Sequence, residues 1–196
     1  MLKRTFDIFF SLIGLLAISP LLFVIALIVI IESKGGIFYS QSRVGKNNVD
    51  FKLYKIRTMY TNADKKGLLT IGNRDSRITK VGYYLRKYKI DELPQLLNIL
   101  LGEMSFVGPR PEVRKYVDLY TVEQLKVLNI KPGLTDFASL FYYHENEHLS
   151  KFEDPEKEYI ETLMPHKIEL NLEYIRKQNF ILDVLIILKT IFKWVK

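Results

Sequence analysis

Cysteine is absent from all 196 residues of the chain. This absence excludes a disulfide framework and any metal site built on thiolates, and it fits a reducing compartment. Internal repeats and low-complexity tracts are absent as well. The length is that of one domain with ample material for a core.

Acidic residues are scarce in the middle of the chain. Residues 34–131 contain 19 Lys and Arg against 9 Asp and Glu, whereas residues 132–182 contain 5 against 10. An electropositive middle can face anionic lipid, nucleotide phosphates or nucleic acid. No nucleic-acid-binding motif is visible, so nucleic acid is not expected as a partner.

Charge is missing altogether from residues 8–31, a run of 24 positions. A helix needs about 20 apolar residues to cross a bilayer core, and the run is too long for a cleaved signal peptide. Ser19 and Pro20 lie in its middle. Proline kinks or breaks a helix, which leaves two halves of about 12 residues, each too short to span alone.

Basic residues flank this run on both sides, so the positive-inside tendency gives no direction. That symmetry suits a hairpin with both ends on the cytoplasmic side. The residues alone fit a spanning helix and a re-entrant helix-break-helix equally. At the other end, residues 182–196 predict a basic amphipathic helix, which suits a membrane interface or packing on the core.

The rest of the chain predicts a mostly helical α+β domain with a small antiparallel hairpin. Residues 37–41 and 49–57 alternate like strands around the turn residues 45–48, and residues 61–74 read as a loop. The predicted helices cover 78–88, 91–101, 112–128 and a stretch from Asp154-Pro155 to about Arg176, broken near Pro165. The predicted domains are a membrane-inserted segment 1–33, a catalytic domain 34–181 and a terminal helix 182–196.

Two adjacent carboxylates, Asp91 and Glu92, stand at a predicted helix start. Pro94 falls in the first turn, where its missing N–H costs little. Five basic residues lie close in sequence: Arg77, Lys80, Arg86, Lys87 and Lys89. Carboxylates beside cations indicate a site for a phosphorylated substrate, with Asp91 as a candidate nucleophile. On this stretch alone, Asp91 also fits a simple helix cap.

Several motifs, taken in order, resemble the bacterial sugar transferase family, the monotopic phosphoglycosyl transferases, in its small form without extra N-terminal membrane helices. The motifs are Tyr54-Lys55-Ile56-Arg57-Thr58-Met59, the run from Asp75 to Arg86, Asp91-Glu92-Leu93-Pro94-Gln95, the run from Gly102 to Gly108-Pro109-Arg110-Pro111, Lys131-Pro132-Gly133-Leu134-Thr135 and Leu182-Asp183. With the apolar N-terminus, they cover nearly the whole chain.

The resemblance implies a re-entrant N-terminal segment with its break at Ser19 and Pro20. It also implies a two-step reaction in the first membrane step of surface glycan synthesis, such as exopolysaccharide or O-antigen. Asp91 matches the family's nucleophile, which attacks the β-phosphate of a UDP-sugar, releases UMP and holds the phosphosugar covalently. Undecaprenyl phosphate then takes the phosphosugar. Glu92 matches the acidic partner, in proton transfer or metal binding.

The same resemblance places the enzyme at the inner leaflet of the bacterial inner membrane, with its catalytic domain facing the cytoplasm. It implies Mg²⁺ as cofactor, with Asp91 as direct ligand, since a diphosphate substrate calls for a divalent cation. Arg110, held between two prolines, is the expected phosphate clamp. Lys55, Arg57 and Arg86 match further basic positions. Asp183 matches a family-like Asp near the C-terminus and also fits a helix cap.

The chain departs from the family pattern at a few positions. Lys89 replaces a small hydroxyl residue, Asp136 replaces a glycine, Glu103 replaces an aspartate, and residues 137–141 replace a Gln-containing run. These changes leave the transferred sugar open. The oligomeric state is open as well.

Two other functions fit parts of the sequence. His144-Glu145-Asn146-Glu147-His148 matches H-E-x-x-H, the pattern of a zinc hydrolase, with Glu161, His166 or Glu169 as a third ligand. A basic, non-enzymatic peripheral membrane adaptor explains the charge and the apolar segments. It leaves the Asp91-Glu92 and Gly-Pro-Arg-Pro stretches without a role.

Overall fold

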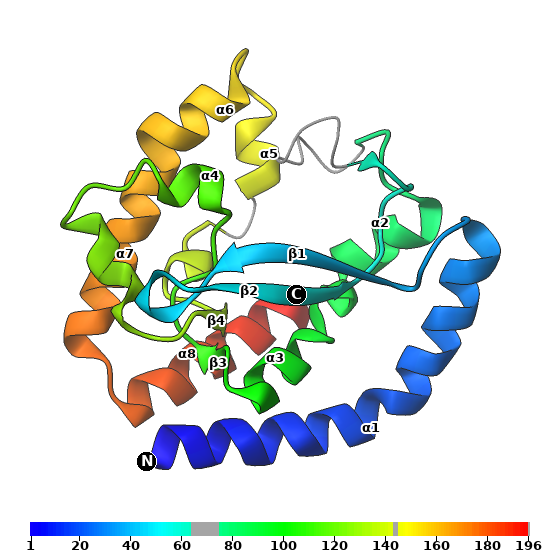
Figure 1. Cartoon of the computed structure of the whole chain (residues 1–196), viewed down its shortest axis with the longest axis horizontal. Coiled ribbons are helices and arrows are strands. Elements are labelled where there is room, and N and C mark those ends of the chain that lie inside the picture. The colour runs from blue at the N-terminus through cyan, green and yellow to red at the C-terminus, as the bar shows by residue number, and fades with distance from the viewer. Residues whose placement is uncertain (64–74, 143–144, 196) are drawn as a thin grey trace.

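The computed structural model describes residues 1–63, 75–142 and 145–195. Helices dominate, as Figure 1 shows, and the antiparallel hairpin is small. The α-helices are α1 (Leu2–Glu32), α2 (Lys80–Lys87), α3 (Gln95–Leu101), α4 (Arg114–Val117), α5 (Glu145–Leu149), α6 (Pro155–Glu158), α7 (Met164–Lys177) and α8 (Phe180–Val195). Short helical turns are η1 (Lys46–Asn48), η3 (Ile90–Glu92), η4 (Gln124–Asn129), η5 (Ala138–Leu140) and the π-turn η6 (Tyr159–Leu163). These elements confirm the predicted class, a mostly helical α+β chain with a long apolar N-terminal helix.

The predicted hairpin is confirmed. Strands β1 (Phe38–Val44) and β2 (Asp50–Ile56) pair antiparallel from Phe38↔Ile56 to Val44↔Asp50. The turn between them uses Asn47 and Asn48 at φ 57° and 63°. Asparagine enters this left-handed region more readily than most residues, which explains why the chain reverses there.

A second strand pair was not predicted. Strands β3 (Ser105–Val107) and β4 (Gly133–Thr135) pair in parallel. Two glycines make the close approach possible, since a Cβ on Gly108 would lie 2.3 Å from the Lys131 carbonyl oxygen and one on Gly133 would lie 2.1 Å from the Gly108 nitrogen. The pair sets the Gly-Pro-Arg-Pro segment beside the Lys-Pro-Gly-Leu-Thr segment.

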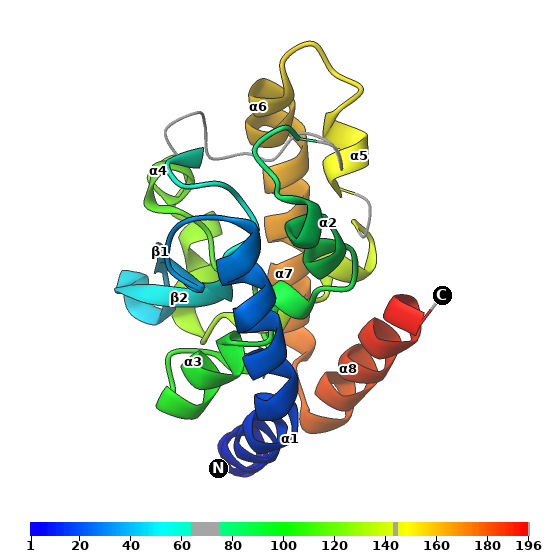
Figure 2. The same ribbon diagram turned by 90° about the vertical axis from the view of Figure 1, so that its right-hand side faces the viewer.

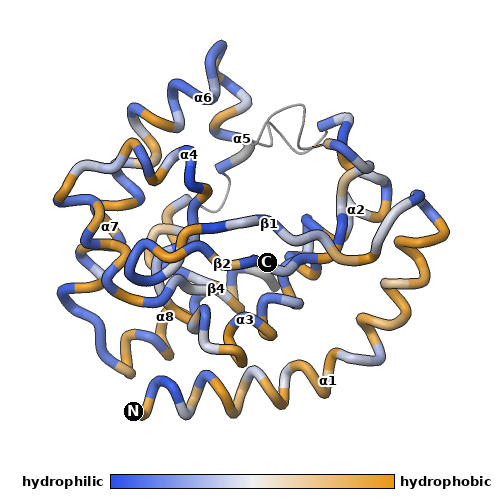
Figure 3. The backbone as a smooth tube through the Cα atoms, viewed as in Figure 1, coloured by the Kyte–Doolittle hydropathy of each residue, from blue (hydrophilic) through white to orange (hydrophobic). Residues whose placement is uncertain are grey.

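Helix α1 runs without interruption through Pro20, and its axis changes direction near the middle (Figure 1). The Ser19 hydroxyl donates to the Leu16 carbonyl oxygen at 2.9 Å. Apolar residues cover most of the helix (Figure 3), which is long and apolar enough to cross a membrane. The bend is therefore a feature of one continuous helix, and the re-entrant arrangement stays a prediction.

The first turns of α1 are tied to the rest of the molecule by charged side chains. Arg4 donates to the carbonyl oxygens of Ile99 and Leu100 at the end of α3, at 2.6 and 2.8 Å. Asp7 is buried and accepts from the Ser105 hydroxyl and the Phe106 amide, both at 3.1 Å. These contacts fix the direction in which α1 leaves the globular part.

Figures 1 and 2 agree that α8 and the N-terminal half of α1 lie at one end of the molecule, with α5 and α6 at the other. Exposed apolar side chains line α8: Ile181, Leu185, Leu188, Ile191 and Phe192. Such a surface suits a membrane interface. The interfacial placement of α8 stays a prediction.

The predicted helix over 112–128 is wrong. Only α4 and η4 form there, separated by a turn. The Gln124 side chain accepts from the Thr121 amide at 2.8 Å, and the Thr121 hydroxyl accepts from the Gln124 amide at 3.3 Å. This reciprocal capping box starts a new helical turn and stops the first from continuing. The apolar spacing was real, because Val113 and Tyr116 of the first turn and Val127 of the second share one core cluster.

The helix predicted from Asp154 begins there, with the Asp154 side chain accepting from the Lys157 amide at 3.0 Å. The break predicted near Pro165 is wrong. A π-helical turn, η6, leads into α7, and Pro165 falls in the first turn of α7. The wider π turn directly before Pro165 accommodates a residue without an amide N–H, and the helix continues through the proline.

Candidate active site

The adjacent carboxylates Asp91 and Glu92 lie in the short turn η3, between α2 and α3. Lys89 takes the left-handed conformation, at φ 55°, and turns the chain from α2 into η3. Both carboxylates are only 6% exposed. Two buried acids side by side are expensive unless cations neutralise them.

Two cations from distant parts of the chain hold Glu92. Lys55 Nζ, from β2, lies 2.9 Å from Oε1, and Arg110 from the Gly-Pro-Arg-Pro segment forms a two-point ion pair, with Nη1 3.3 Å from Oε2 and Nη2 against Oε1. Asp91, Glu92, Lys55 and Arg110 therefore meet at one place, as the motifs predicted.

The two acids differ in electrostatics. Burial raises the pKa of Asp91, and Lys55 and Arg86 oppose this effect only in part. Burial also works against the ionised form of Glu92, but Arg110 and Lys55 together hold the pKa of that carboxyl well below its usual value. Adjacent acids with pKa values pushed apart are typical of sites where two carboxylates have different tasks.

The cations respond to the same charges. Burial lowers the pKa of Lys55 despite its ion pair with Glu92, and burial likewise lowers the pKa of Arg86 against the attraction of Asp91. The Glu92 carboxylate raises the pKa of Arg110. Arg110 therefore stays charged, and its side chain is 37% exposed. It is able to meet an anionic group from solvent while it holds Glu92.

One oxygen of the Asp91 carboxylate has no hydrogen-bond partner among the described residues. Oδ1 is buried and has no hydrogen-bond partner within the described ranges. The helix caps recorded for η3 and α3 are Lys89 and Pro94, neither with a side-chain bond. Asp91 is therefore not the cap of this helix start.

Gln95 is a neighbour that the motif reading did not single out. It lies four residues after Asp91, is 2% exposed, and its Nε2 also lacks a partner in the described part of the chain. Both residues belong to one sequence motif, Asp91-Glu92-Leu93-Pro94-Gln95, and that motif was the available signal for Gln95.

Asp136, where the family pattern has glycine, is a buried carboxylate that accepts three hydrogen bonds. It is 1% exposed, and its oxygens accept from the Arg110 amide at 3.3 Å, the Ser139 amide at 2.7 Å and the Asn171 side chain at 3.1 Å. The departure at 136 thus fixes the backbone that carries Arg110. It also links that backbone to α7.

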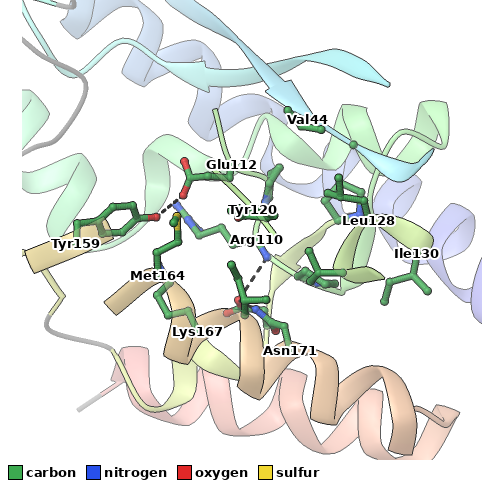
Figure 4. A pocket seen from close by; sticks show the side chains of 17 residues that line it. Val44, Arg110, Glu112, Tyr120, Leu128, Ile130, Tyr159, Met164, Lys167 and Asn171 are labelled. Atoms are coloured by element: carbon green, nitrogen blue, oxygen red, sulfur yellow. Dashed lines mark hydrogen bonds between the residues drawn. The ribbon is translucent and has the colours of Figure 1, made fainter. Parts of the chain in front are cut away.

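A pocket lies beside Arg110, as Figure 4 shows. Its walls come from the Gly-Pro-Arg-Pro segment, from η4 and from α7. Lys167 and Asn171 extend from α7 toward the segment with Arg110 (Figure 4). Glu112 on another wall accepts from the Tyr159 hydroxyl.

Other predicted site residues lie elsewhere. Arg57 is buried and donates to the carbonyl oxygens of Ser33, at 2.8 Å, and Lys34, just past the end of α1. Asp183 lies in the first turn of α8, paired with Lys3 at 2.8 Å and bonded by the Tyr174 hydroxyl at 2.5 Å. These two residues join α1 to the globular part. In the described part of the chain, neither forms a hydrogen bond or ion pair with Asp91 or Glu92.

His144 of the H-E-x-x-H pattern lies outside the described residues. Glu145 pairs with Lys167 at 2.8 Å, and His148 lies 3.8 Å from Glu158 and against the ring of Phe152. Across residues 1–63, 75–142 and 145–195, no group of three or more potential metal ligands occurs. The described partners of the pattern thus give the zinc hypothesis no support.

The site at Asp91 suits a cation of another kind. One buried carboxylate oxygen without a partner fits Mg²⁺, which takes few protein ligands and completes its shell with water and substrate phosphates. Glu92 is already committed to Lys55 and Arg110, so Asp91 is the group that would hold the ion.

Comparison with known proteins agrees with the motifs. A model of the bacterial sugar transferase family matches residues 1–196, and the chain belongs to this family. The match confirms the resemblance that the motifs indicated. Membrane association and an apolar N-terminal helix go with this family assignment.

Several curated relatives carry the names of sugar-phosphate transferases. The chain is 37% identical over 193 residues to a UDP-N-acetylgalactosamine-undecaprenyl-phosphate N-acetylgalactosaminephosphotransferase of Aeromonas hydrophila, covering 97% of this chain and 43% of that protein. It is 46% identical over 134 residues to a putative undecaprenyl-phosphate N-acetylgalactosaminyl 1-phosphate transferase of Bacillus subtilis (strain 168), covering 68% and 71%.

A third relative is the UDP-glucose:undecaprenyl-phosphate glucose-1-phosphate transferase of Escherichia coli (strain K12), 35% identical over 201 residues, with 98% of this chain and 40% of that protein covered. The chain thus spans less than half the length of the Aeromonas and Escherichia relatives. Their names include two different sugars, so family membership leaves the transferred sugar open.

Proposed function

We propose that the chain is a phosphoglycosyl transferase that moves a sugar-1-phosphate from a UDP-sugar to undecaprenyl phosphate. The observation that carries this function is the buried Asp91 oxygen without a partner, set beside a Glu92 held by Lys55 and Arg110. Family membership and the names of the relatives support the same reaction class.

In the first step, the Asp91 carboxylate attacks the β-phosphorus of the UDP-sugar. The bond from that phosphorus to the bridging oxygen breaks, UMP leaves with the oxygen, and an acyl phosphate joins Asp91 to the phosphosugar. In the second step, a phosphate oxygen of undecaprenyl phosphate attacks the same phosphorus. The bond to Asp91 breaks, which regenerates the carboxylate and yields a polyprenyl diphosphate sugar.

The chain's own groups serve these steps through charge and position. Arg110 and Lys55 neutralise negative charge beside Asp91. Because both form ion pairs with Glu92, they are held in place before the substrate binds. Mg²⁺ held by Asp91 and the diphosphate would supply further neutralisation. Glu92, ionised by its cation partners, holds Lys55 and Arg110 in position beside Asp91.

The location follows from the acceptor. Undecaprenyl phosphate is a membrane lipid, and α1 is the apolar element that would place the site at the inner leaflet of the inner membrane, facing the cytoplasm. The product would enter synthesis of a surface polysaccharide.

A screen of UDP-sugars tests the proposal. Purified protein in nanodiscs with undecaprenyl phosphate and Mg²⁺ should release UMP from at least one UDP-sugar. Without the lipid, the same sugar should add one phosphosugar mass to the peptide that contains Asp91. Folded protein that releases no UMP from any UDP-sugar contradicts the function.

A further inference from the structure

Helix α2 begins beside the end of α1, at the point where the apolar run of α1 stops. Glu32, the first charged residue after that run, accepts from the Val81 amide in the first turn of α2, at 3.0 and 3.2 Å to its two carboxylate oxygens. In a spanning and in a re-entrant arrangement alike, such a run ends where the helix leaves the hydrocarbon core. The first turn of α2 therefore belongs at the bilayer interface.

One face of α2 is packed and keeps the helix alongside α1. Val81 and Leu85 belong to the same apolar cluster as Ile25 and Val29 of α1. The two helices contact each other, and Figures 1 and 2 show α2 beside the C-terminal half of α1. Because α2 is only about 12 Å long, all of it stays close to the end of α1.

The outer face of α2 is aromatic and basic. Five residues recur at i, i+3, i+4, i+7 and i+8, which is the spacing of one helix face: Lys80, Tyr83, Tyr84, Lys87 and Tyr88. The three tyrosines are 38%, 60% and 54% exposed in that order. The helix contains no acidic residue, and neither lysine forms an ion pair with a residue that the structure describes. The outer face is therefore positively charged and its charge is not compensated within α2.

Contacts within this face order its side chains but leave their polar groups available. The rings of Tyr83 and Tyr84 meet edge to face with centroids 5.3 Å apart, and Lys87 Nζ lies 5.4 Å from the centroid of the Tyr88 ring. Tyrosine rings favour the headgroup level of a membrane, where the ring meets apolar chains and the hydroxyl meets polar groups. Lysines at the same level are attracted to anionic lipids. The outer face of α2 thus combines the two residue types that anionic headgroups attract.

We propose that the outer face of α2 docks on the anionic phospholipid headgroups of the membrane that holds α1. The inference rests on the proposed membrane insertion of α1. It also gives α2 a part in the proposed reaction. Helix α2 leads through Lys89 directly into η3, which carries Asp91, and the two elements are in contact. Docking of α2 therefore holds Asp91 close to the headgroup level, where the phosphate of a lipid acceptor lies.

Depth-dependent fluorescence quenching tests the docking. The chain has a single tryptophan, Trp194, so Trp194→Phe gives a background in which Tyr84→Trp is the only reporter. The full chain is placed in vesicles of phosphatidylcholine and phosphatidylglycerol, with bromine on the acyl chains either next to the headgroup or near the chain ends. Bromine next to the headgroup should quench the reporter more strongly. Omission of phosphatidylglycerol should weaken this quenching, and so should Lys80→Gln/Lys87→Gln in the reporter protein. Quenching that responds to neither change would overturn the docking on anionic lipid.

Two further reporters in the same background separate the other outcomes. Phe23→Trp, at a position 66% exposed on α1, should be quenched by bromine in the acyl chains. Phe152→Trp, at a position 40% exposed between α5 and α6, should be quenched by neither lipid. Quenching of Phe23→Trp without quenching of Tyr84→Trp would overturn the docking of α2. Stronger quenching of Tyr84→Trp by bromine at the chain ends would place α2 in the hydrocarbon and overturn it too. Absence of quenching for Phe23→Trp would overturn the insertion of α1, and the docking with it.

The two half-reactions distinguish a lipid surface from a nucleobase site. Tyr84→Ala/Tyr88→Ala should form the Asp91 adduct from the UDP-sugar at the wild-type rate, which also shows that the variant is folded. It should transfer the phosphosugar to undecaprenyl phosphate in vesicles several-fold more slowly, and Phe152→Ala should match wild type in both steps. Transfer at the wild-type rate would overturn the link between α2 and the acceptor.

Slower adduct formation with a raised KM for the UDP-sugar would show instead that the tyrosine rings stack on uracil, and it would overturn the lipid docking. Failure of wild type to form an adduct with any UDP-sugar is a separate result. It contradicts the proposed function, whereas the quenching measurements still decide on the docking of α2.

Discussion

Arg110 forms a two-point ion pair with Glu92, in which Nη1 lies 3.3 Å from Oε2 and Nη2 contacts Oε1. Lys55 approaches Oε1 as well, at 2.9 Å. Both oxygens of Glu92 therefore have cationic partners. Oδ1 of its neighbour Asp91, by contrast, has no hydrogen-bond partner among the described residues. In the proposed reaction, the two adjacent acids therefore have separate tasks: Glu92 organises positive charge, and Asp91 remains available to react.

Asp91→Asn tests the role of the available oxygen. The amide preserves size but removes the attacking charge, so UMP release should fall to background while the protein stays folded. Asp118→Asn is the matched control, because Asp118 is an exposed carboxylate outside the site. Steady-state UMP release and mass spectrometry of the Asp91 peptide give the readout. Full activity in Asp91→Asn, or an adduct on another residue, would rule out the assignment.

Glu92→Gln should slow UMP release by about a hundredfold or more, the typical effect of losing one preorganised electrostatic contact at a reacting centre. The substitution leaves Lys55 and Arg110 without the carboxylate that holds them both beside Asp91. Loss of one partner from a buried ion pair costs about 3–5 kcal/mol, and the half-exposed Arg110 puts this case toward the low end or below. Urea unfolding at pH 7 measures the loss.

The pH dependence of that loss has a defined sign. Because the pKa of Glu92 is lower in the folded protein than its ordinary 4.5, its ionisation stabilises the fold above that value, and the stabilisation is lost as pH falls through the folded pKa. The difference in unfolding free energy between wild type and Glu92→Gln should therefore be constant from pH 8 to about 5 and shrink below about 4.5. A difference that grows on acidification would contradict the sign.

Local patterns predicted the elements whose causes are local. The hairpin follows from alternation around Asn47 and Asn48, and α2 and α3 follow from apolar spacing. The pair β3–β4 could not be predicted, because strands of three residues have no readable period and meet across 28 positions. The helix expected over 112–128 failed because the Thr121–Gln124 capping box outweighed continuous apolar spacing.

The sequence predicted which residues gather at the site better than it predicted where each side chain lies. Asp91, Glu92, Lys55 and Arg110 were identified from motifs, and the structure brings them together. Arg57 is a residue whose surroundings could not be predicted from its motif. It lies two residues from Lys55 in the same motif, but β2 ends at Ile56, and the next side chain reaches the end of α1 instead. Only the tertiary fold reveals such a change of direction.

Arg57→Met is expected to affect the fold more than substrate binding. It removes two hydrogen bonds from a charged donor to the carbonyl oxygens of Ser33 and Lys34, worth roughly 1.5–3 kcal/mol each. The melting temperature in nanodiscs should fall, while KM for the UDP-sugar should stay within about twofold. Arg110→Met is the comparison, and its KM should rise at least tenfold. A large rise in KM for Arg57→Met with an unchanged melting temperature would instead support Arg57 as a substrate ligand.

The topology of α1 is open to a direct test, because a chain without cysteine accepts single reporters. Leu2 and Lys46 are both exposed and lie on either side of the apolar run. In a re-entrant arrangement, Leu2→Cys and Lys46→Cys should both react only with a reagent that reaches the cytoplasmic side. Pro20→Ala restores the missing N–H and removes the clash that bends the helix, so it should straighten α1 and move part of the Leu2→Cys population to the periplasmic side. Labelling of Leu2→Cys from the periplasm in the protein with Pro20 intact would establish a spanning helix and exclude the re-entrant one.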